Sequence, residues 1–228
     1  MATLLRDKFL LFVFPLLLLT ACGLTATDNP KSGLEVQYGT VNDDHAVDLA
    51  TYNDKVYATS TTRLADGRVS AGIRSFARDG STLWLRANSD NPEYRYTYQN
   101  LGVDASGSVY ELVMARRIIL GGIVEEMHLR KYSGNALRWS RRIDPSGYGG
   151  TFFGEMVVTA NGVYLFGNYD FPVSSMVRYG SNGSLVSTQE LEGGYVRAST
   201  FDSNGNIYVV LEGNNPLLQK FTPSGSRL

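Results

Sequence analysis

The chain has 228 residues, and its 21 lysines and arginines against 22 aspartates and glutamates give a formal net charge of −1. These charges form no long runs, which excludes the basic stripe of a nucleic-acid-binding protein. A single cysteine excludes a fold held by intrachain disulfides. The 24 glycines and 14 tyrosines, with no helical periodicity after residue 30, favour short strands joined by many turns.

The N-terminus has the layout of an export signal. Arg6 and Lys8 precede an apolar run of 11 residues, Phe9 to Leu19, and small residues lead to Cys22. A permanent transmembrane helix needs roughly 20 apolar residues, so the run is too short for one. The tetrapeptide LTAC (19–22) resembles the bacterial lipobox, whose cysteine is diacylated on sulfur and becomes the first residue after cleavage. The alternative is an ordinary secretory signal with an incidental cysteine.

The lipobox resemblance implies an exported protein that Cys22 anchors to a membrane of the cell envelope. Gly23 stands where an aspartate would signal inner-membrane retention, so we expect the outer membrane in a two-membrane bacterium. The following residues are polar, with proline and glycine, and are typical of a flexible tether. We therefore expect a signal peptide at 1–21, the lipidated N-terminus and tether at 22–32, and a repeat domain at 33–228.

Two phrases recur four times along that domain. The first turns on Asn, Asp, Ser or Gly and restarts with Val or Ile followed by Tyr, in ATYNDKVYATS (50–60), VDASGSVYELV (103–113), VTANGVYLFG (158–167) and FDSNGNIYVVL (201–211). The second closes a strand with an aromatic residue and turns tightly, in SFARDGSTLWL (75–85), KYSGNALRW (131–139), RYGSNGSLV (178–186) and KFTPSGSRL (220–228). Each unit therefore predicts two hairpins, or four strands, which is the content of a propeller blade.

The repeated tyrosines and turns have structural interpretations. We expect Tyr57, Tyr110, Tyr164 and Tyr208 to pack between blades. The acidic turn DSNGN (202–206) lacks the ligand spacing of an EF-hand calcium loop, and its Asn-Gly pair is typical of a tight hairpin. The sequence therefore predicts no metal site and no cofactor.

These phrases resemble the SBBP-type bacterial β-propeller repeat, roughly D-x-x-G-N-x-Y-V-x-G followed by an aromatic and a later tryptophan. Trp84 and Trp139 occupy the tryptophan position in the first two units, whereas Val186 replaces it in the third. The resemblance covers residues 45–228 and implies architecture rather than activity. The expected fold is all-β, a propeller of about four four-stranded antiparallel blades, with no helical domain after the signal peptide.

The fourth unit ends where its last strand should begin, and GLEVQYGT (33–40) precedes the first unit as a strand without a hairpin partner. We expect this N-terminal strand to close the ring by pairing as the outer strand of the last blade, which would remove open sheet edges. The alternatives are an open arc completed by a second copy or a partner, and a truncated product.

Long connections are expected on one face of the propeller: RLADGR (63–68), RANSDNPEYRYTY (86–98), DPSGYGGTFF (144–153), NYDFPV (168–173) and EGNNP (212–216). Recognition residues usually lie on such loops, and tyrosine and arginine are favoured at binding hot spots. The candidate binding residues of this loop face are Tyr94, Arg95, Tyr96, Tyr148, Tyr169 and Phe171. The alternative is that these aromatic residues only pad the loops against the sheets.

Aligning the units on their repeated tyrosines brings a set of polar residues to one level of the innermost strands: Asp48, Gln99, Asn100, Glu155 and Arg197. Such a ring in the channel can hold a small ligand or a cation, or can simply surround water. The familiar catalytic motifs are absent, and His45 and His128 lie in different units. The sequence assigns no catalytic residue, and it favours a protein that is not an enzyme.

The function expected from these observations is that of a lipid-anchored binding or scaffolding module for a protein, a peptide or a glycan. The first alternative is a hydrolase or lyase with a polar site in the central channel. The second is a purely structural envelope lipoprotein. The expected partners are the membrane, through acylated Cys22, and one such ligand, with self-association if the propeller is open.

Overall fold

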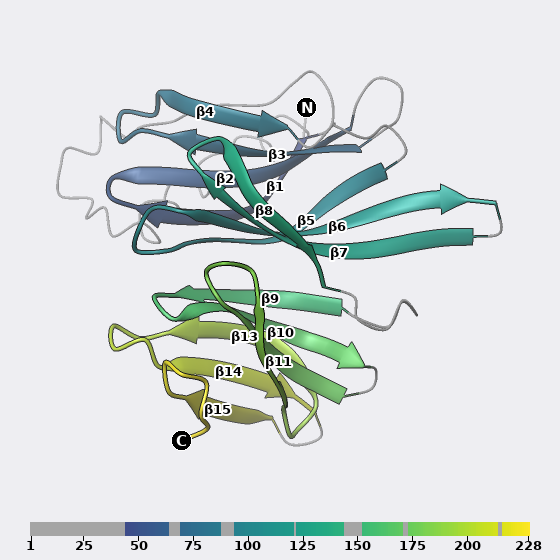
Figure 1. Cartoon of the computed structure of the whole chain (residues 1–228), viewed down its shortest axis with the longest axis vertical. Coiled ribbons are helices and arrows are strands. Elements are labelled where there is room, and N and C mark those ends of the chain that lie inside the picture. Colours follow the sequence, from purple (N-terminus) through teal and green to yellow (C-terminus); the bar gives the residue numbers. More distant parts are fainter. Residues whose placement is uncertain are drawn as a thin grey trace, which may run out of the picture.

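The computed structural model describes residues 44–63, 69–87, 94–120, 122–143, 152–170, 173–213 and 216–228. Every regular element within these residues is a β-strand, and the strands form four antiparallel sheets. The sheets follow one another along the long axis of the molecule, from the N-terminal sheet at the top of Figure 1 to the C-terminal sheet at the bottom. The predicted all-β fold with four propeller blades is confirmed.

Each blade is one sheet whose strands pair in chain order. The first blade contains β1 (Asp44–Tyr52), β2 (Lys55–Arg63), β3 (Val69–Phe76) and β4 (Thr82–Ala87). The second contains β5 (Tyr94–Val103), β6 (Val109–Ile119), β7 (Gly122–Ser133) and β8 (Ala136–Arg142). The third contains β9 (Phe152–Thr159), β10 (Gly162–Asp170), β11 (Val173–Tyr179) and β12 (Leu185–Glu190). The fourth contains β13 (Tyr195–Phe201), β14 (Ile207–Glu212) and β15 (Leu217–Phe221).

The described part of the fourth blade thus has three strands, where the repeat led us to expect four. An isolated antiparallel bridge between Phe221 and Arg227 continues the sheet beyond β15. Residues 33–40 lie outside the described residues, and so does the predicted closure of the ring by that segment.

The first repeated phrase forms the hairpin between the first two strands of each blade. In the fourth blade, Asp202 accepts hydrogen bonds from the main-chain N–H groups of Asn204 and Asn206, each at 2.9 Å. Gly205 follows with a φ of 78°, in the left-handed region that favours glycine. The second blade repeats this arrangement around Asp104. The acidic residue of DSNGN therefore stabilises a tight turn.

Apolar side chains fill the spaces between successive blades. One cluster joins the first and second blades, another the second and third, and another the third and fourth. Tyr57, Tyr110 and Tyr164 belong to these clusters and are 4%, 1% and 0% exposed, as their predicted packing role requires. Tyr208 is only partly buried, because no cluster among the described residues joins the fourth blade to the first.

The tryptophans of the repeat complete this packing. The ring centroids of Trp84 and Tyr57 lie 6.1 Å apart in the first blade, and those of Trp139 and Tyr110 lie 6.0 Å apart in the second. Tilted and edge-on pairs at such distances stabilise a protein beyond the apolar area they bury. The two pairs are equivalent, as the repeat predicts.

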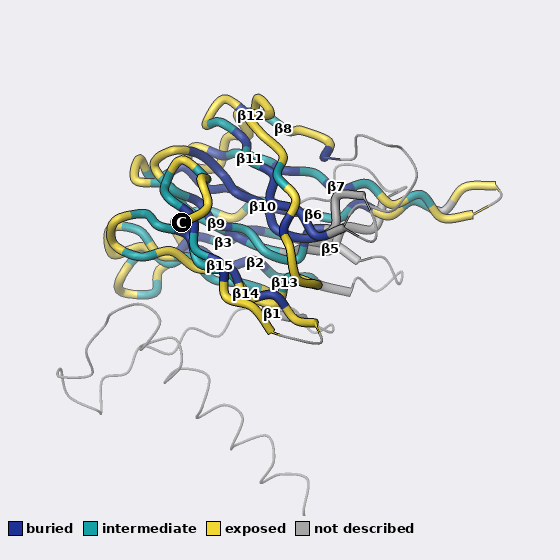
Figure 2. Tube along the Cα trace, turned by 90° about the horizontal axis from the view of Figure 1, so that it is seen from below, coloured by how far each residue is buried: buried dark blue, intermediate teal, exposed yellow. Residues whose placement is uncertain are grey.

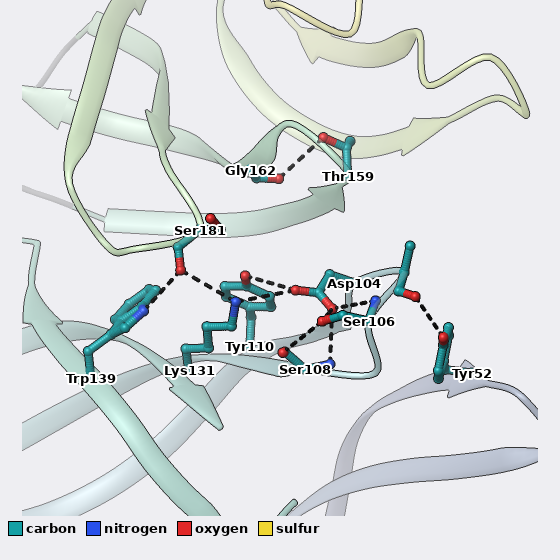
Figure 3. A network of polar contacts seen from close by, with 11 residues as sticks. Tyr52, Asp104, Ser106, Ser108, Tyr110, Lys131, Trp139, Thr159, Gly162 and Ser181 are labelled. Carbon is teal, nitrogen blue, oxygen red and sulfur yellow. Dashed lines mark hydrogen bonds and ion pairs between the residues drawn. The ribbon is translucent and has the colours of Figure 1, made fainter. Parts of the chain in front are cut away.

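Polar contacts at the short turns tie neighbouring blades together (Figure 3). Lys131 and Trp139 of the second blade both donate to the main-chain oxygen of Ser181 in the third, at 3.4 and 3.1 Å. Tyr52 of the first blade donates to the main-chain oxygen of Ala105 in the second, at 2.6 Å. The short turns of this face therefore hold neighbouring blades in place.

Candidate functional site

The candidate binding residues lie on strands more often than the sequence suggested. Tyr94, Arg95 and Tyr96 are the first three residues of β5, and Tyr169 is the penultimate residue of β10. The prediction that these four residues lie in connections was therefore wrong. The four strand positions are nevertheless at the ends of β5 and β10 that border the long connections. Tyr148, Phe171 and Cys22 lie outside the described residues.

Three strands of the second blade form a projecting arm. We use this name for residues 94–96 of β5, 115–119 of β6 and 122–126 of β7. Their register places Tyr94, Arg95 and Tyr96 opposite Arg117, Arg116 and Ala115. The strands β6 and β7 have 11 and 12 residues, whereas the equivalent strands of the other blades have five to nine. The paired strands of the arm are therefore longer than their equivalents, and their hairpin projects at the right of Figure 1.

A β-bulge interrupts each innermost strand at an equivalent place. The register shifts leave Val47, Gln99, Gly154 and Arg197 as the extra residues in β1, β5, β9 and β13. Asp48, Asn100 and Glu155 directly follow three of these bulges. The five polar residues aligned from the repeats are thus at equivalent positions, either in a bulge or immediately after it. Bulges redirect side chains, which is why they recur near functional sites.

Asp48 uses both carboxylate oxygens to bind main-chain N–H groups. Its Oδ1 accepts from Leu49 at 2.8 Å, and its Oδ2 accepts from Leu101 of the next innermost strand at 2.7 Å. Burial raises the pKa of Asp48, although these two hydrogen bonds oppose the shift. The residue is therefore a tie between the first and second blades.

Glu155 forms the equivalent tie between the third and fourth blades. Its Oε2 accepts from the main-chain N–H of Ser199 at 3.1 Å and from the hydroxyl of Ser199 at 3.2 Å. Burial raises the pKa of Glu155, the two hydrogen bonds from Ser199 oppose the shift, and the negative charge of Asp48 adds a smaller increase. The two carboxylates therefore interact electrostatically across the innermost strands, although each is held by a different pair of blades.

The remaining polar residues of the level do not join these carboxylates. Arg197 pairs with Glu212 of its own blade, and both side chains are more than half exposed. The Oδ1 atom of Asn100 is buried without a hydrogen-bond partner among the described residues. The position of Gln99 is that of the bulge in β5, and its side chain lies outside what the structure describes. The structure thus brings Asp48 and Glu155 into one electrostatic environment and separates Arg197 from them.

Asp48 makes stability depend on pH in a defined direction. A carboxyl group whose pKa is raised by folding binds its proton more tightly in the native state, so stability falls as pH rises through that pKa. The ordinary aspartate pKa is 3.8, and the window begins there. We expect the wild type to lose more unfolding free energy between about pH 4 and pH 7 than Asp48→Asn. Urea unfolding at several pH values measures this difference.

Thr51, exposed on the same strand and without a titratable group, offers a matched control. Thr51→Ala should leave the pH profile parallel to that of the wild type. Parallel profiles for Asp48→Asn as well would contradict the assignment of Asp48 as a buried tie.

The repeats did not point to the tip of the arm, which is the end of the hairpin between β6 and β7. Ile119, Leu120 and Ile123 are 43%, 105% and 58% exposed, and they surround the turn between β6 and β7. The segment IILGGIV (118–124) carried a readable signal, because an apolar run interrupted only by two glycines is unusual in a surface turn. The repeated phrases, however, drew attention to the turns at the other ends of the strands.

The described ranges contain neither a cluster of metal-binding side chains nor a membrane-spanning helix. Within them, no three His, Cys, Asp or Glu side chains come close enough together to hold a metal ion. Nor does any helix in that part of the chain have the length and apolar character needed to cross a membrane. His128 lies 3.3 Å from Glu126, and burial lowers the pKa of the imidazole.

The comparisons with known proteins show the fold alone. No family model matches the chain, and no curated protein matches it. An ulvan lyase, from a new family of polysaccharide lyase, is 13% identical with a TM-score of 0.53, over 89% of this chain and 58% of its own. A Bacteroides caccae protein of unknown function is 14% identical with a TM-score of 0.51, over 84% and 62%. Trypanosoma rangeli sialidase is 12% identical with a TM-score of 0.50, over 82% and 37%.

This chain therefore spans less than two thirds of the length of these structures. At such identities the similarity confirms the β-propeller arrangement and carries no residue from one protein to the other. Without a matching family model, the resemblance to SBBP-type repeats rests on the quoted phrases alone.

Proposed function

We propose that this chain is a lipid-anchored propeller of the cell envelope that binds a protein, a peptide or a glycan through the face with the long connections. The observation that carries the proposal is the projecting arm of the second blade. It places Tyr94, Arg95 and Tyr96 on a three-stranded support beside Arg116 and Arg117. Tyrosine and arginine are enriched among the hot-spot residues that carry most of the binding energy of an interface.

The use of the other polar residues supports the same proposal. Hydrogen bonds to main-chain N–H groups occupy both oxygens of Asp48 and one oxygen of Glu155. A general acid or base must exchange its proton with a substrate, and such ties hinder that exchange. The structural role of these carboxylates is the reason to prefer recognition on the arm over catalysis at the innermost strands.

The competing proposal is a hydrolase or lyase centred on Asp48 and Glu155. The observation in its favour is that both carboxyl groups have raised pKa values and interact electrostatically. The similarity to a polysaccharide lyase is a similarity of fold, at 13% identity. A purely structural envelope protein is the third alternative, and it would depend on neither set of residues.

The location of the protein in the cell envelope is part of the same proposal. Acylation of Cys22 would hold the protein at the envelope, with the outer membrane favoured where there are two membranes. Two or more acyl chains hold a protein at a bilayer stably, whereas one does so only marginally. If the propeller is an open arc, the partly buried Tyr208 face of the fourth blade is where a second copy would add.

Crosslinking in living cells, followed by identification of captured molecules, tests the function. We expect the wild type to capture a discrete partner, and substitution of Tyr94, Tyr96, Tyr148 and Tyr169 by alanine to weaken capture by about thirtyfold or more, since a hot-spot side chain contributes at least about 2 kcal/mol. Asp48→Asn with Glu155→Gln is the matched control and should retain the partner.

Two results would decide against the proposed binding function. Loss of the partner in the carboxylate variant alone would support the channel-centred enzyme. Capture of nothing by any variant would support the structural alternative. For the anchor, the wild type should carry an acyl label and fractionate with membranes, and Cys22→Ser should lose both properties.

A further inference from the structure

The two strands that lead to the tip of the arm, β6 and β7, are longer than the equivalent strands of the other blades. Aligning the blades on Tyr57 and Tyr110 makes Arg63, the last residue of β2, equivalent to Arg116. The strand β6 continues for Arg117, Ile118 and Ile119, which at about 3.4 Å per residue adds roughly 10 Å. Figure 2 shows the resulting hairpin extending away from the blades with both strands exposed near its end.

The tip is apolar where a surface turn is normally polar. Leu120 is fully exposed at 105%, and Ile119 and Ile123 beside it are 43% and 58% exposed. None of these side chains lies in one of the three core clusters. These three side chains therefore lie outside the packed core of the described fold, and burying them away from water would be favourable.

Two ion pairs lie at the base of the arm. Arg116 pairs with Glu125 across the two strands, and Glu126 pairs with Arg142 at 3.2 Å. The arm thus presents an apolar end above these ion pairs, and its strands also carry Arg95 and Arg117. A surface that binds through this end should be driven by apolar burial and should depend only weakly on salt.

The size and shape of the tip favour a lipid bilayer over a protein groove. Three aliphatic side chains offer roughly 200–350 Å² of apolar area by the usual transfer energies. A stable protein interface buries about 600 Å² or more on each side, and its hot spots are rich in Trp, Tyr and Arg. A narrow convex end with only aliphatic side chains instead fits the interfacial region of a membrane, where apolar groups enter by about 5–10 Å.

The course of the chain brings the tip to the side of the anchor. The first residue of β1, Asp44, pairs with Thr62 at the end of β2, so the chain enters the propeller on the face that carries the arm. Residues 23–43 separate Cys22 from that strand, and 21 residues span at most roughly 70 Å. A propeller tethered at Cys22, as the proposed function requires, therefore has its arm within reach of the same bilayer.

We infer that Ile119, Leu120 and Ile123 insert into the interfacial region of the membrane and orient the anchored propeller on it. Insertion of three aliphatic side chains is weak and reversible by itself, like that of a single acyl chain. Combined with the anchor, it fixes the orientation of the propeller relative to the bilayer. The arm then presents Tyr94, Arg95 and Tyr96 at a fixed height above the lipid.

Because Cys22 is the only cysteine, a fluorophore can be attached at one chosen position. The full chain with Cys22→Ser and Leu120→Cys carries an environment-sensitive dye at the tip, and the probe is a vesicle of phosphatidylcholine and phosphatidylglycerol. We expect a blue shift and quenching by a quencher placed in the acyl chains, both persisting at high salt. Asn135→Cys, in the turn at the opposite end of β7, is the matched control and should stay in water.

A second variant separates insertion of the tip from adhesion of the apolar N-terminal segment, which all variants share. Adding Ile119→Ser and Ile123→Ser to the labelled chain should weaken partitioning by about tenfold or more. These side chains are exposed, so unfolding of the variant should match that of its parent. An unshifted dye at position 120, or an equal shift at 120 and 135, would overturn the inference, as would an unchanged shift in the serine variant.

Crosslinking from position 120 in cells adds one further outcome. Transfer of the crosslinker to an envelope protein in place of lipid would overturn insertion and make the tip a protein contact. Every labelled variant carries serine at position 22 and keeps the four binding tyrosines. Failure of tip insertion therefore leaves the proposed anchor and recognition role untouched, and failure of either of those leaves this test unchanged.

Discussion

Replacing Phe153 by alanine is expected to lower the free energy of unfolding by about 3–5 kcal/mol. Phe153 is 0% exposed and lies at the start of β9, in the cluster that joins the second and third blades. The same cluster contains Leu112 and Leu129 of the second blade and Val163 and Leu165 of its own. Its removal would leave a cavity that two rigid sheets cannot close.

Denaturant unfolding followed by fluorescence measures this loss. Leu218→Ala is the matched control, because Leu218 is an apolar strand residue that is 63% exposed on the fourth blade. Its substitution should change the free energy by less than about 1 kcal/mol. Similar effects for the two variants would show that the blades do not depend on the cluster between them.

Replacing Arg130 by methionine is expected to destabilise the protein by a comparable 3–5 kcal/mol or so. Arg130 and Glu111 face each other across β6 and β7, with Arg130 Nη1 and Glu111 Oε1 3.7 Å apart. The Glu111 side chain is 0% exposed and that of Arg130 is 13% exposed. Methionine keeps much of the volume but removes the cation set against a buried carboxylate, whose charge then loses its compensation.

The double variant Glu111→Leu with Arg130→Leu separates charge from packing. Replacing both members of a buried ion pair by apolar residues is often neutral or stabilising, so the double variant should recover most of the loss. Thermal unfolding of both variants and the wild type measures this. A double variant as unstable as the single one would show that Arg130 acts mainly through its packing.

The repeats predicted the blades because each phrase encodes its own local structure. In DSNGN, an aspartate that accepts main-chain hydrogen bonds and a glycine with positive φ suffice to form the turn, whatever surrounds it. The isoleucine and tyrosine that follow supply a strand with one face for the neighbouring blade. Four copies of this unit made four propeller blades the natural prediction.

The candidate site was harder to predict because it depends on where pairing stops. Tyr94 and Tyr96 follow a stretch rich in Asn, Asp and Pro, so they read as part of a connection. The structure adds them to β5, because Arg117 and Ala115 of the long β6 strand offer them partners. Strand length at such an edge is set by the neighbouring strand and not by local propensity.

The polar residues of the innermost strands were likewise predicted in part from the sequence and in part only from the structure. The alignment of tyrosines placed Asp48 and Glu155 at equivalent positions, and the bulges at Val47 and Gly154 keep them so. Only the structure shows that each carboxylate accepts a hydrogen bond from a main-chain N–H of the next blade. These hydrogen bonds join residues that are 53 and 44 positions apart in the chain, which no local pattern can reveal.

The sequence by itself determined the strand content, the four repeated units and the residues that pack between blades. These properties depend on short-range patterns, namely turn residues and the alternation of apolar and polar side chains. The tertiary structure decided that Asp48 and Glu155 tie blades together, that Tyr94 to Tyr96 lie on a projecting arm, and that Leu120 is its exposed end. These properties depend on which strands lie side by side and how far they pair, and the packing of whole blades sets both.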